Sequence, residues 1–254
     1  MVVGVEKMTD VTASEISTEL STAADADWES DQGVSFVGLN ALLMQRYMHE
    51  YGWQKADFAN FALNAHANGA GNPKARFQRA ITREQYEKAT MISPPINIMD
   101  ASPVSDGAAA VVITSIEAAR SVAKQPIVRI IGSAAATDSI TVHGRKDALW
   151  LTAAYDSAKR AYDQAGISPS DIDFFELHDA FSIMAALSLE AAGFAERGSA
   201  PRMALDGEIG LLGRLPIATM GGLKARGHPV GATGMYQIAE VVQQIGRASC
   251  RERV

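Results

Sequence analysis

Cysteine is almost absent from this sequence, whose 254 residues contain one, Cys250. A single cysteine excludes an internal disulfide, and this usage suits a reducing compartment. The sequence also lacks an apolar run long enough to span a bilayer, and its start, MVVGVEKMTD, lacks the succession of charged, apolar and small residues of a signal peptide. We therefore expect a cytoplasmic protein with no membrane span.

Positive charge is in short supply. The formal net charge is -6 and the sequence pI is about 5.4, which argues against a general binder of nucleic acid or anionic membranes, because those functions depend on a broad positive field. A local basic patch must therefore meet any anionic ligand. Lys74, Arg76, Arg79 and Arg83 offer one, although a solvated charged face is the simpler interpretation.

Several sequence motifs are missing as well. There is neither a G-x-x-x-x-G-K-[ST] phosphate loop nor a G-x-G-x-x-G fingerprint, so a nucleoside triphosphate or nicotinamide site has no support. The five histidines are scattered without a second ligand at metal spacing. We expect no permanently bound cofactor and no metal.

What is present is the pattern of an α/β protein, with 47% hydrophobic residues and a chain long enough for a sizeable core. Residues 1–7, 106–115 and 126–136 are small or β-branched runs that predict buried strands. Residues 40–52 and 151–166 predict helices that end at glycine. Between Asp25 and Pro95 the periodicity weakens, which predicts an irregular, partly helical excursion.

His178 lies where a short predicted strand, formed by Ile172, Phe174 and Leu177, gives way to helical periodicity. The side chain of Asp179 is placed to cap the first turn of that helix. Ligands of open α/β sheets bind at the carboxyl ends of strands, so His178 is a candidate site residue. A hydrogen-bonded core histidine is an equally good interpretation of the position alone.

His228 lies in a second such segment, within a loop that holds five glycines in the fourteen residues from Gly221 to Gly234. So many glycines indicate tight turns or close approach of the backbone to another group. Pro229 restricts the backbone of His228 to extended geometry. Ile238, Val241 and Val242 then predict one face of a following helix. The glycines could instead serve only for close packing between layers.

These two segments carry a family resemblance. HDAFS, from His178 to Ser182, and GGLKARGHPVGATG, from Gly221 to Gly234, resemble signature blocks of the thiolase superfamily, in particular its sterol-carrier-protein-type and archaeal acetoacetyl-CoA branch. GVEKM near the start, SPVSDGAAAVVI and AYDQAGISPSDIDFFELHD agree in order. The resemblance extends to about Gln244.

The resemblance implies a five-layered αβαβα fold of two similar halves. Residues 1–24 and 96–122 would belong to the N-terminal half, 25–95 to an inserted loop domain and 123–244 to the C-terminal half. It also implies acyl transfer between CoA thioesters, by Claisen condensation or thiolysis of 3-ketoacyl-CoA, in a homodimer or homotetramer.

Roles for individual residues follow from the same resemblance. His228 would assist the nucleophile and donate to one thioester oxygen, and His178 would stand where most thiolases have an asparagine donor. Ser102, Gly227 and Phe181 would contact substrate, and Ser102 aligns with a serine that touches the pantetheine arm of CoA in relatives. Arg76 and Arg79 are the candidates for the CoA phosphates.

The nucleophilic cysteine of the family lies upstream of the block that GVEKM resembles, so we expect these 254 residues to lack it and to be inactive alone. Cys250 does not replace it, because its neighbours ASCRERV contain no glycine and do not continue the helical pattern. Back-translated as ATC GGA AGA GCG TCG TGT AGG GAA AGA GTG, residues 245–254 match a sequencing-library adapter. We expect a fragment with a non-native tail; a solvated basic terminus is the alternative.

Two other functions remain open from the sequence. A noncatalytic acyl-CoA or lipid-binding relative would keep the fold without the nucleophile. A ketosynthase would share the fold and the two histidines, but those enzymes carry an H-G-T-type block where this chain has HDAFS. They also usually lack a proline after the second histidine.

Overall fold

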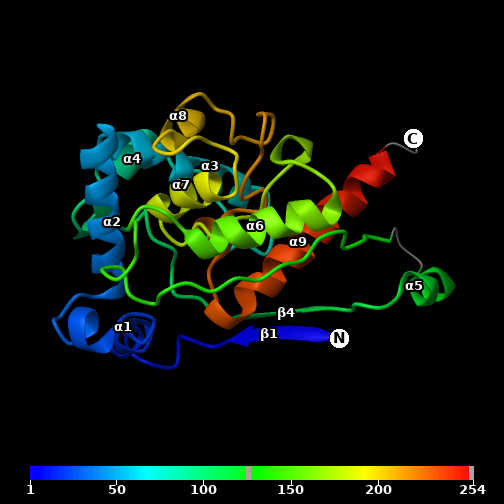
Figure 1. Ribbon diagram of the computed structural model, residues 1–254, viewed down its shortest axis with the longest axis horizontal. Coiled ribbons are helices and arrows are strands. Elements are labelled where there is room, and N and C mark those ends of the chain that lie inside the picture. The colour runs from blue at the N-terminus through cyan, green and yellow to red at the C-terminus, as the bar shows by residue number, and fades with distance from the viewer. Residues whose placement is uncertain (124–126, 252–254) are drawn as a thin grey trace.

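The computed structural model describes residues 1–123 and 127–251, which form a mainly helical body with two small sheets (Figure 1). The strands are β1 (Val2–Glu6), β2 (Met91–Ser93), β3 (Ile96–Asn97) and β4 (Gly107–Val111). The α-helices are α1 (Ala13–Ser21), α2 (Phe36–Tyr51), α3 (Ala59–Ala70), α4 (Arg83–Glu87), α5 (Ile116–Val122), α6 (Thr152–Ala165), α7 (Ser182–Ala191), α8 (Ala200–Leu205) and α9 (Thr233–Arg251). Short helical turns are η1 (Ala26–Ser30), η2 (Lys55–Phe58), η3 (Pro169–Asp171), η4 (Gly222–Arg226) and η5 (Val230–Ala232). Within the described residues no helix is both long and apolar enough to cross a membrane.

The core is built around α7, which lies among α2, α3, α6 and α8 (Figure 1). Eight of its ten residues are buried, including Ile183, Leu187 and Leu189. A helix that is apolar on every side has no face to offer water, so it occupies the middle of the helical layer. This helix follows directly on the His178 segment and fixes where that segment ends.

The excursion between Asp25 and Pro95 contains more regular helix than the sequence pattern indicates. As predicted, α2 ends at Gly52, whose φ of 75° gives the left-handed cap. α3 lies against η4, where a Cβ on Gly69 would come within 2.7 Å of the Cβ of Ala225. The side-chain amide of Asn72 donates to Met220 O at 2.8 Å. The excursion therefore supports the glycine-rich loop from one side.

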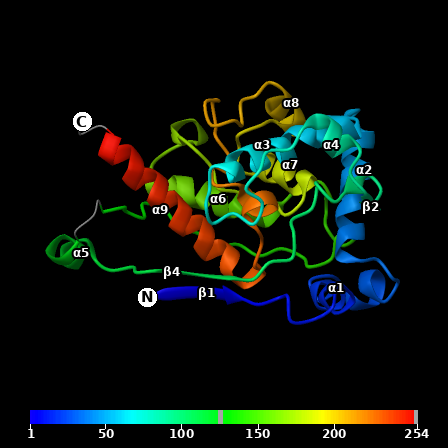
Figure 2. The same cartoon turned by 180° about the vertical axis from the view of Figure 1, so that it is seen from behind.

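β1 and β4 confirm two of the predicted strands and pair antiparallel, with Val2 opposite Val111 and Glu6 opposite Gly107. Figure 2 shows this ribbon running beside the start of α9. The prediction that β1 is buried is wrong, since Val3 is 55% and Val5 67% exposed. The ribbon has two strands and only the Gly4 side of β1 is covered, by η5 and the beginning of α9.

The strand predicted at residues 126–136 is also not observed. Pro126 lies outside the described residues, and 127–136 form no ladder, with Ile130 64% exposed. Residues 172–177 make a single parallel bridge, between Phe175 and Ile217. β-branched runs favour strands only where another strand supplies hydrogen-bond partners, and no described segment pairs with 127–136. They border instead an apolar groove of about 1380 Å³, whose lining includes Ile130, Ala158, His178, Ile238, Val241 and Val242.

α6 and α9, which border that groove, match the predicted helices except at the end of α9. α6 ends at Gly166, with φ 69°, as predicted. α9 carries the predicted apolar face, but it continues to Arg251, so the prediction that the helical pattern stops in the tail is wrong. Alanine and arginine are strong helix formers and can extend a helix without an apolar stripe. Residues 252–254 of that tail lie outside the described part.

Candidate active site

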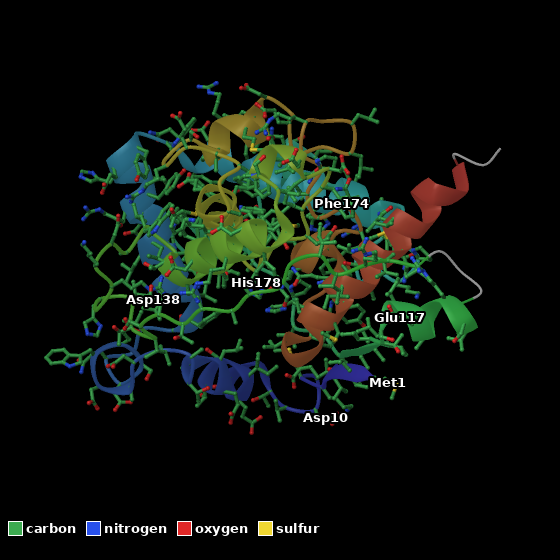
Figure 3. The ribbon with its side chains drawn as sticks, turned by 45° about the vertical axis from the view of Figure 1, so that its right-hand side comes forward. Met1, Asp10, Glu117, Asp138, Phe174 and His178 are labelled. Atoms are coloured by element: carbon green, nitrogen blue, oxygen red, sulfur yellow. The ribbon has the colours of Figure 1, made fainter. Side chains whose placement is uncertain are left out.

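His178 and His228, fifty residues apart in the sequence, meet in the structure. Their ring centroids are 5.0 Å apart and the ring planes are nearly perpendicular, at 83°. His178 comes from the extended segment ahead of α7, and Figure 3 labels it in the middle of the molecule. His228 comes from the end of the glycine-rich loop, just ahead of η5. The two segments that the sequence singled out therefore form one site.

The backbone of His228 is held on the SPVSDG segment. His228 bridges to Val104, and its N–H donates to Ser105 Oγ at 3.2 Å. Gly227 makes this approach possible, because its φ is 115° and a Cβ there would lie 2.8 Å from Ser105 Oγ. Gly227 thus has a clear structural role at the site, and its substrate contact stays a prediction.

Thr233, the first residue of α9, sets the protonation pattern of the His228 ring. Its Oγ1 lies 2.7 Å from His228 Nδ1 and donates to Pro229 O at 3.0 Å. A hydroxyl has one proton to give, so the His228 Nδ1 carries the hydrogen of the shared contact and Nε2 keeps its lone pair. Sequence reasoning missed this residue; a hydroxyl five positions after the histidine, at a helix start, was the available signal.

Both histidines are held in their neutral form. Burial, with a further contribution from His178, lowers the pKa of His228 to about 4. His178 is exposed at the apolar groove, yet desolvation by the protein atoms packed around its ring lowers its pKa against the opposing effect of Asp179. At neutral pH the pair can therefore accept a proton or donate a neutral N–H hydrogen bond.

Asp179 does not cap α7 as predicted. α7 begins at Ser182, and the Asp179 carboxylate points instead into η4, where Oδ1 accepts from Leu223 N at 2.7 Å. Lys224 Nζ donates to Asp179 O at 2.6 Å and lies 3.6 Å from Oδ2. A Cβ on Gly222 would collide with Oδ2, at 2.5 Å. The N–H group that Asp179 binds lies 44 residues away in the sequence, so local sequence patterns could not indicate this contact.

Ser102 and Phe181 lie beside the His178 segment. Ser102 N donates to Ala180 O at 2.8 Å, and Ala101 forms an antiparallel bridge with Phe181. Phe181 is buried and its ring packs on Phe36 with 5.9 Å between centroids. The structure thus gives Phe181 a packing role, and the substrate contacts of both residues remain predictions.

The structure brings Arg76 to the site but not Arg79. The Arg76 backbone N–H donates to Arg226 O at 3.0 Å, and its guanidinium donates to Val104 O. With Lys74 and Arg226 it lines a small polar cavity of about 210 Å³ beside Gly227 and Pro229. Arg79 is exposed and is not among the residues that line this cavity.

Two acidic residues that the sequence did not indicate, the buried Glu240 and the half-buried Glu176, link the segments that carry the histidines. Glu240 of α9 forms an ion pair with Arg226, and burial raises its pKa to about 7 despite the nearby guanidinium. Glu176, two residues before His178, accepts from both N and Oγ1 of Thr219 at 2.6 Å, and burial raises its pKa too. These contacts tie α9 and the loop to the His178 segment. No three His, Cys, Asp or Glu side chains converge as a metal-ligand set in the described part of the chain.

Comparison with known proteins places this site in a family. Residues 134–254 match the Thiolase C-terminal domain-like family. The acetyl-CoA acetyltransferase of Methanothermobacter thermautotrophicus is 42% identical over 98% of this chain, and that of Methanocaldococcus jannaschii is 37% identical over 96%. The chain belongs to the thiolase superfamily. It spans 64% and 63% of the length of these two relatives.

Solved structures agree on the fold. The Ltp2-ChsH2(DUF35) aldolase superposes with a TM-score of 0.80 at 33% identity, over 86% of this chain and 58% of that one. A monomeric SCP2-thiolase-like protein from Mycobacterium smegmatis gives a TM-score of 0.67 over 89% of this chain and 47% of that one; at 21% identity it supports the fold alone. The expected thiolase-like α/β fold class is confirmed.

Proposed function

We propose that this chain supplies the two-histidine half of a thiolase-type acyl-CoA acyltransferase site, for Claisen condensation or thiolysis of 3-ketoacyl-CoA. The observation that supports this most is the pair of neutral imidazoles with 5.0 Å between ring centroids. Similarity to two acetyl-CoA acetyltransferases supports a thiolase-type role. Buried, preorganised donors are what an enolate and a tetrahedral oxyanion need.

The geometry suggests how each histidine acts. In thiolysis a thiolate attacks the 3-keto carbon and becomes acylated, while the C2–C3 bond breaks and its electron pair moves onto the thioester oxygen of the departing acetyl-CoA enolate. C2 of that enolate then takes up a proton, and the acyl group passes to the thiol of free CoA. A neutral N–H of His178 stabilises that oxygen without a full charge. Nε2 of His228, free because Thr233 binds Nδ1, is the base that takes the thiol proton.

The nucleophile of this reaction is not supplied by the described residues around the histidines. Cys250 is the one cysteine, and its backbone lies near the far end of α9, 17 positions after Thr233. At 1.5 Å per residue that is about 25 Å along the helix axis. We therefore propose that the thiolate comes from outside these residues and that the 254-residue chain alone does not turn over.

Coenzyme A thioesters are the proposed substrates, with no resident cofactor. Lys74 and Arg76 bring positive charge to one small cavity, which Asp106 also lines and where Arg226 is already paired with Glu240. The two exposed cations support Arg76 as a phosphate contact, and Arg79 is proposed by sequence alone. Ser102 is proposed to face the pantetheine arm. A homodimer or homotetramer in the cytoplasm completes the proposal.

Aldol-type cleavage of an acyl-CoA is the second candidate. One structural relative at 33% identity is described as an aldolase. Such cleavage also passes through a CoA enolate but needs a base and donors rather than an acyl-carrying thiolate.

One experiment separates these reactions. The protein, extended to the full length of its relatives, is incubated with acetoacetyl-CoA with and without free CoA, and separately with a 3-hydroxyacyl-CoA without CoA. CoA-dependent formation of acetyl-CoA supports the thiolase proposal. Release of an aldehyde or ketone from the hydroxyacyl substrate alone supports the aldolase. Binding of CoA with neither reaction, in a protein extended to the full length of its relatives, indicates a noncatalytic acyl-CoA binder.

A further inference from the structure

We propose that Lys224 and Asp179 are positioning residues that clamp the two histidine-bearing segments together and so set the distance between His178 and His228. Neither residue is among the candidates that the sequence motifs gave a chemical role. The activity readout rests on the function proposed above, whereas the distance readout does not.

The clamp is made of main-chain contacts. Asp179 directly follows His178, and Lys224 lies four residues before His228. The carboxylate of Asp179 accepts the N–H of Leu223 in η4, while the ammonium of Lys224 donates to the carbonyl of Asp179. Each side chain thus holds the backbone of the opposite segment. A shift of either segment would break both hydrogen bonds.

Burial argues that this pair does more than fill space. Lys224 is 1% and Asp179 2% exposed. Apolar side chains of similar volume often replace a buried ion pair with no loss of stability, so stability alone does not explain a lysine here. The loop is also shaped around the Asp179 carboxylate, because a Cβ on Gly222 would lie 2.5 Å from Asp179 Oδ2.

Other charged groups near Lys224 already have partners or a different role. Asp100 is fully buried and accepts from Tyr86 Oη at 2.7 Å and Asn97 N at 3.0 Å. Arg226 is paired with Glu240. Of the described carboxylates around Lys224, only that of Asp179 lies within 4 Å of its Nζ. The Lys224 ammonium therefore contacts the segment that carries His178, through Asp179.

The test is the double variant Lys224→Met/Asp179→Asn in the full-length protein. It removes both charges and the Lys224 hydrogen bond, while the asparagine oxygen can still accept from Leu223. Lys224→Met alone leaves a buried carboxylate without its cation and should unfold at a lower temperature; the double variant should recover most of that loss. Lys159→Met, which breaks the exposed pair with Asp163, is the matched control.

Two readouts apply to the folded double variant. In the wild type and the control, the imidazole protons of His178 and His228 should show a nuclear Overhauser effect, and in the double variant it should weaken or vanish. Turnover should fall about ten- to a hundredfold with a smaller change in KM, because displacement of a reacting group by about 1 Å costs that much. Wild-type spacing and turnover in the double variant would show that neither the Lys224 hydrogen bond nor the charge pair sets the distance between the histidines, and would overturn the proposal that both residues form the clamp.

A further measurement needs no variant. The Leu223 amide should exchange its hydrogen slowly in the wild type, because Asp179 buries and accepts it; exchange at the rate of an open amide would also overturn the proposal. If the wild type catalyses no reaction of a CoA thioester, the proposed function fails, while the Overhauser and exchange data still decide the clamp.

Discussion

The molecule has two regions of similarly apolar sequence and different structural outcome. The packed region consists of α2, α3, α7 and α8 with the glycine-rich loop, and its side chains bury one another. The open face consists of β1, β4 and residues 127–136, where Val5 is 67% and Ile130 64% exposed. Helices satisfy their own backbone hydrogen bonds, so they need only side-chain contacts to pack. Strands need neighbours for backbone and side chains alike.

The two histidines lie where these regions meet. His228 is held by Thr233 at the end of the glycine-rich loop and by Ser105 ahead of β4, while His178 is exposed at the apolar groove. The proposed chemistry requires both imidazoles to be held in fixed positions, which the packed region can provide. Substitutions in the packed region and on the open face test this difference.

Loss of either histidine should have the largest effect. His228→Ala and His178→Ala should each lower kcat/KM of the full-length protein roughly a hundredfold or more, since one preorganised donor is worth a few kcal/mol in the transition state. The double variant should lose much less than the product of the two. Steady-state kinetics measure this. Normal turnover by His178→Ala that merely unfolds at lower temperature would assign His178 to the core.

Matched truncations test the two regions directly. Leu187 in α7 is 1% exposed, so Leu187→Ala should lower the free energy of unfolding by about 2–5 kcal/mol. Ile131→Ala on the open face should change it by less than about 0.5 kcal/mol, because Ile131 is already 52% exposed. Urea denaturation of both variants gives the numbers. Equal losses would mean that residues 127–136 are packed in solution.

Glu240 joins α9 to the packed region and should make stability depend on pH. Its pKa rises from 4.5 to about 7 on folding, so the folded state holds the proton more tightly. The contribution is fully present below pH 4.5 and is lost as pH rises to about 7, with a total of about 3 kcal/mol. Glu240→Gln should remove this slope relative to the wild type in denaturation curves recorded from pH 4.5 to 8. Parallel curves for the two proteins would contradict it.

Alanine substitutions at Gly227 and Gly52 compare a glycine at the proposed active site with a glycine that only caps a helix. Both have positive φ, 115° and 75°, so alanine at either should cost about 1–2 kcal/mol of unfolding free energy. Only at Gly227 would the new Cβ meet another group, Ser105 Oγ. Gly227→Ala should therefore also reduce turnover, whereas Gly52→Ala should leave it near wild type. Comparable turnover in the two folded variants would remove Gly227 from the site.

The smallest effect is expected for single arginines. Arg76→Ala should weaken CoA binding several-fold and reduce its salt dependence, because one charge-assisted contact is lost at the cavity beside Gly227. Arg79→Ala should have less effect, since Arg79 does not line that cavity. Calorimetric titration with CoA at two salt concentrations measures both. Unchanged affinity for Arg76→Ala would leave these arginines as a solvated face.

Much of the local structure could be predicted from particular residues. Gly52 and Gly166 marked the ends of α2 and α6 because a left-handed C-cap requires little beyond a glycine. The segment of His178 and that of His228 could be recognised through their motifs. The partners of those residues could not: Asp179 was assigned to the nearest helix in sequence, and its actual partner, Leu223, is 44 residues away.

The sequence alone was sufficient for the limits of α2 and α6, because a glycine C-cap depends on neighbours within a few residues. The α/β class and the two histidines followed from motifs that resemble those of a known family. Only the tertiary structure decided which apolar runs were buried, which tautomer Thr233 gives His228, and that Lys224, Asp179 and Glu240 surround the pair. Burial, desolvation and ion pairing depend on groups from distant segments. Their effects on pKa and position arise when the chain brings those groups together.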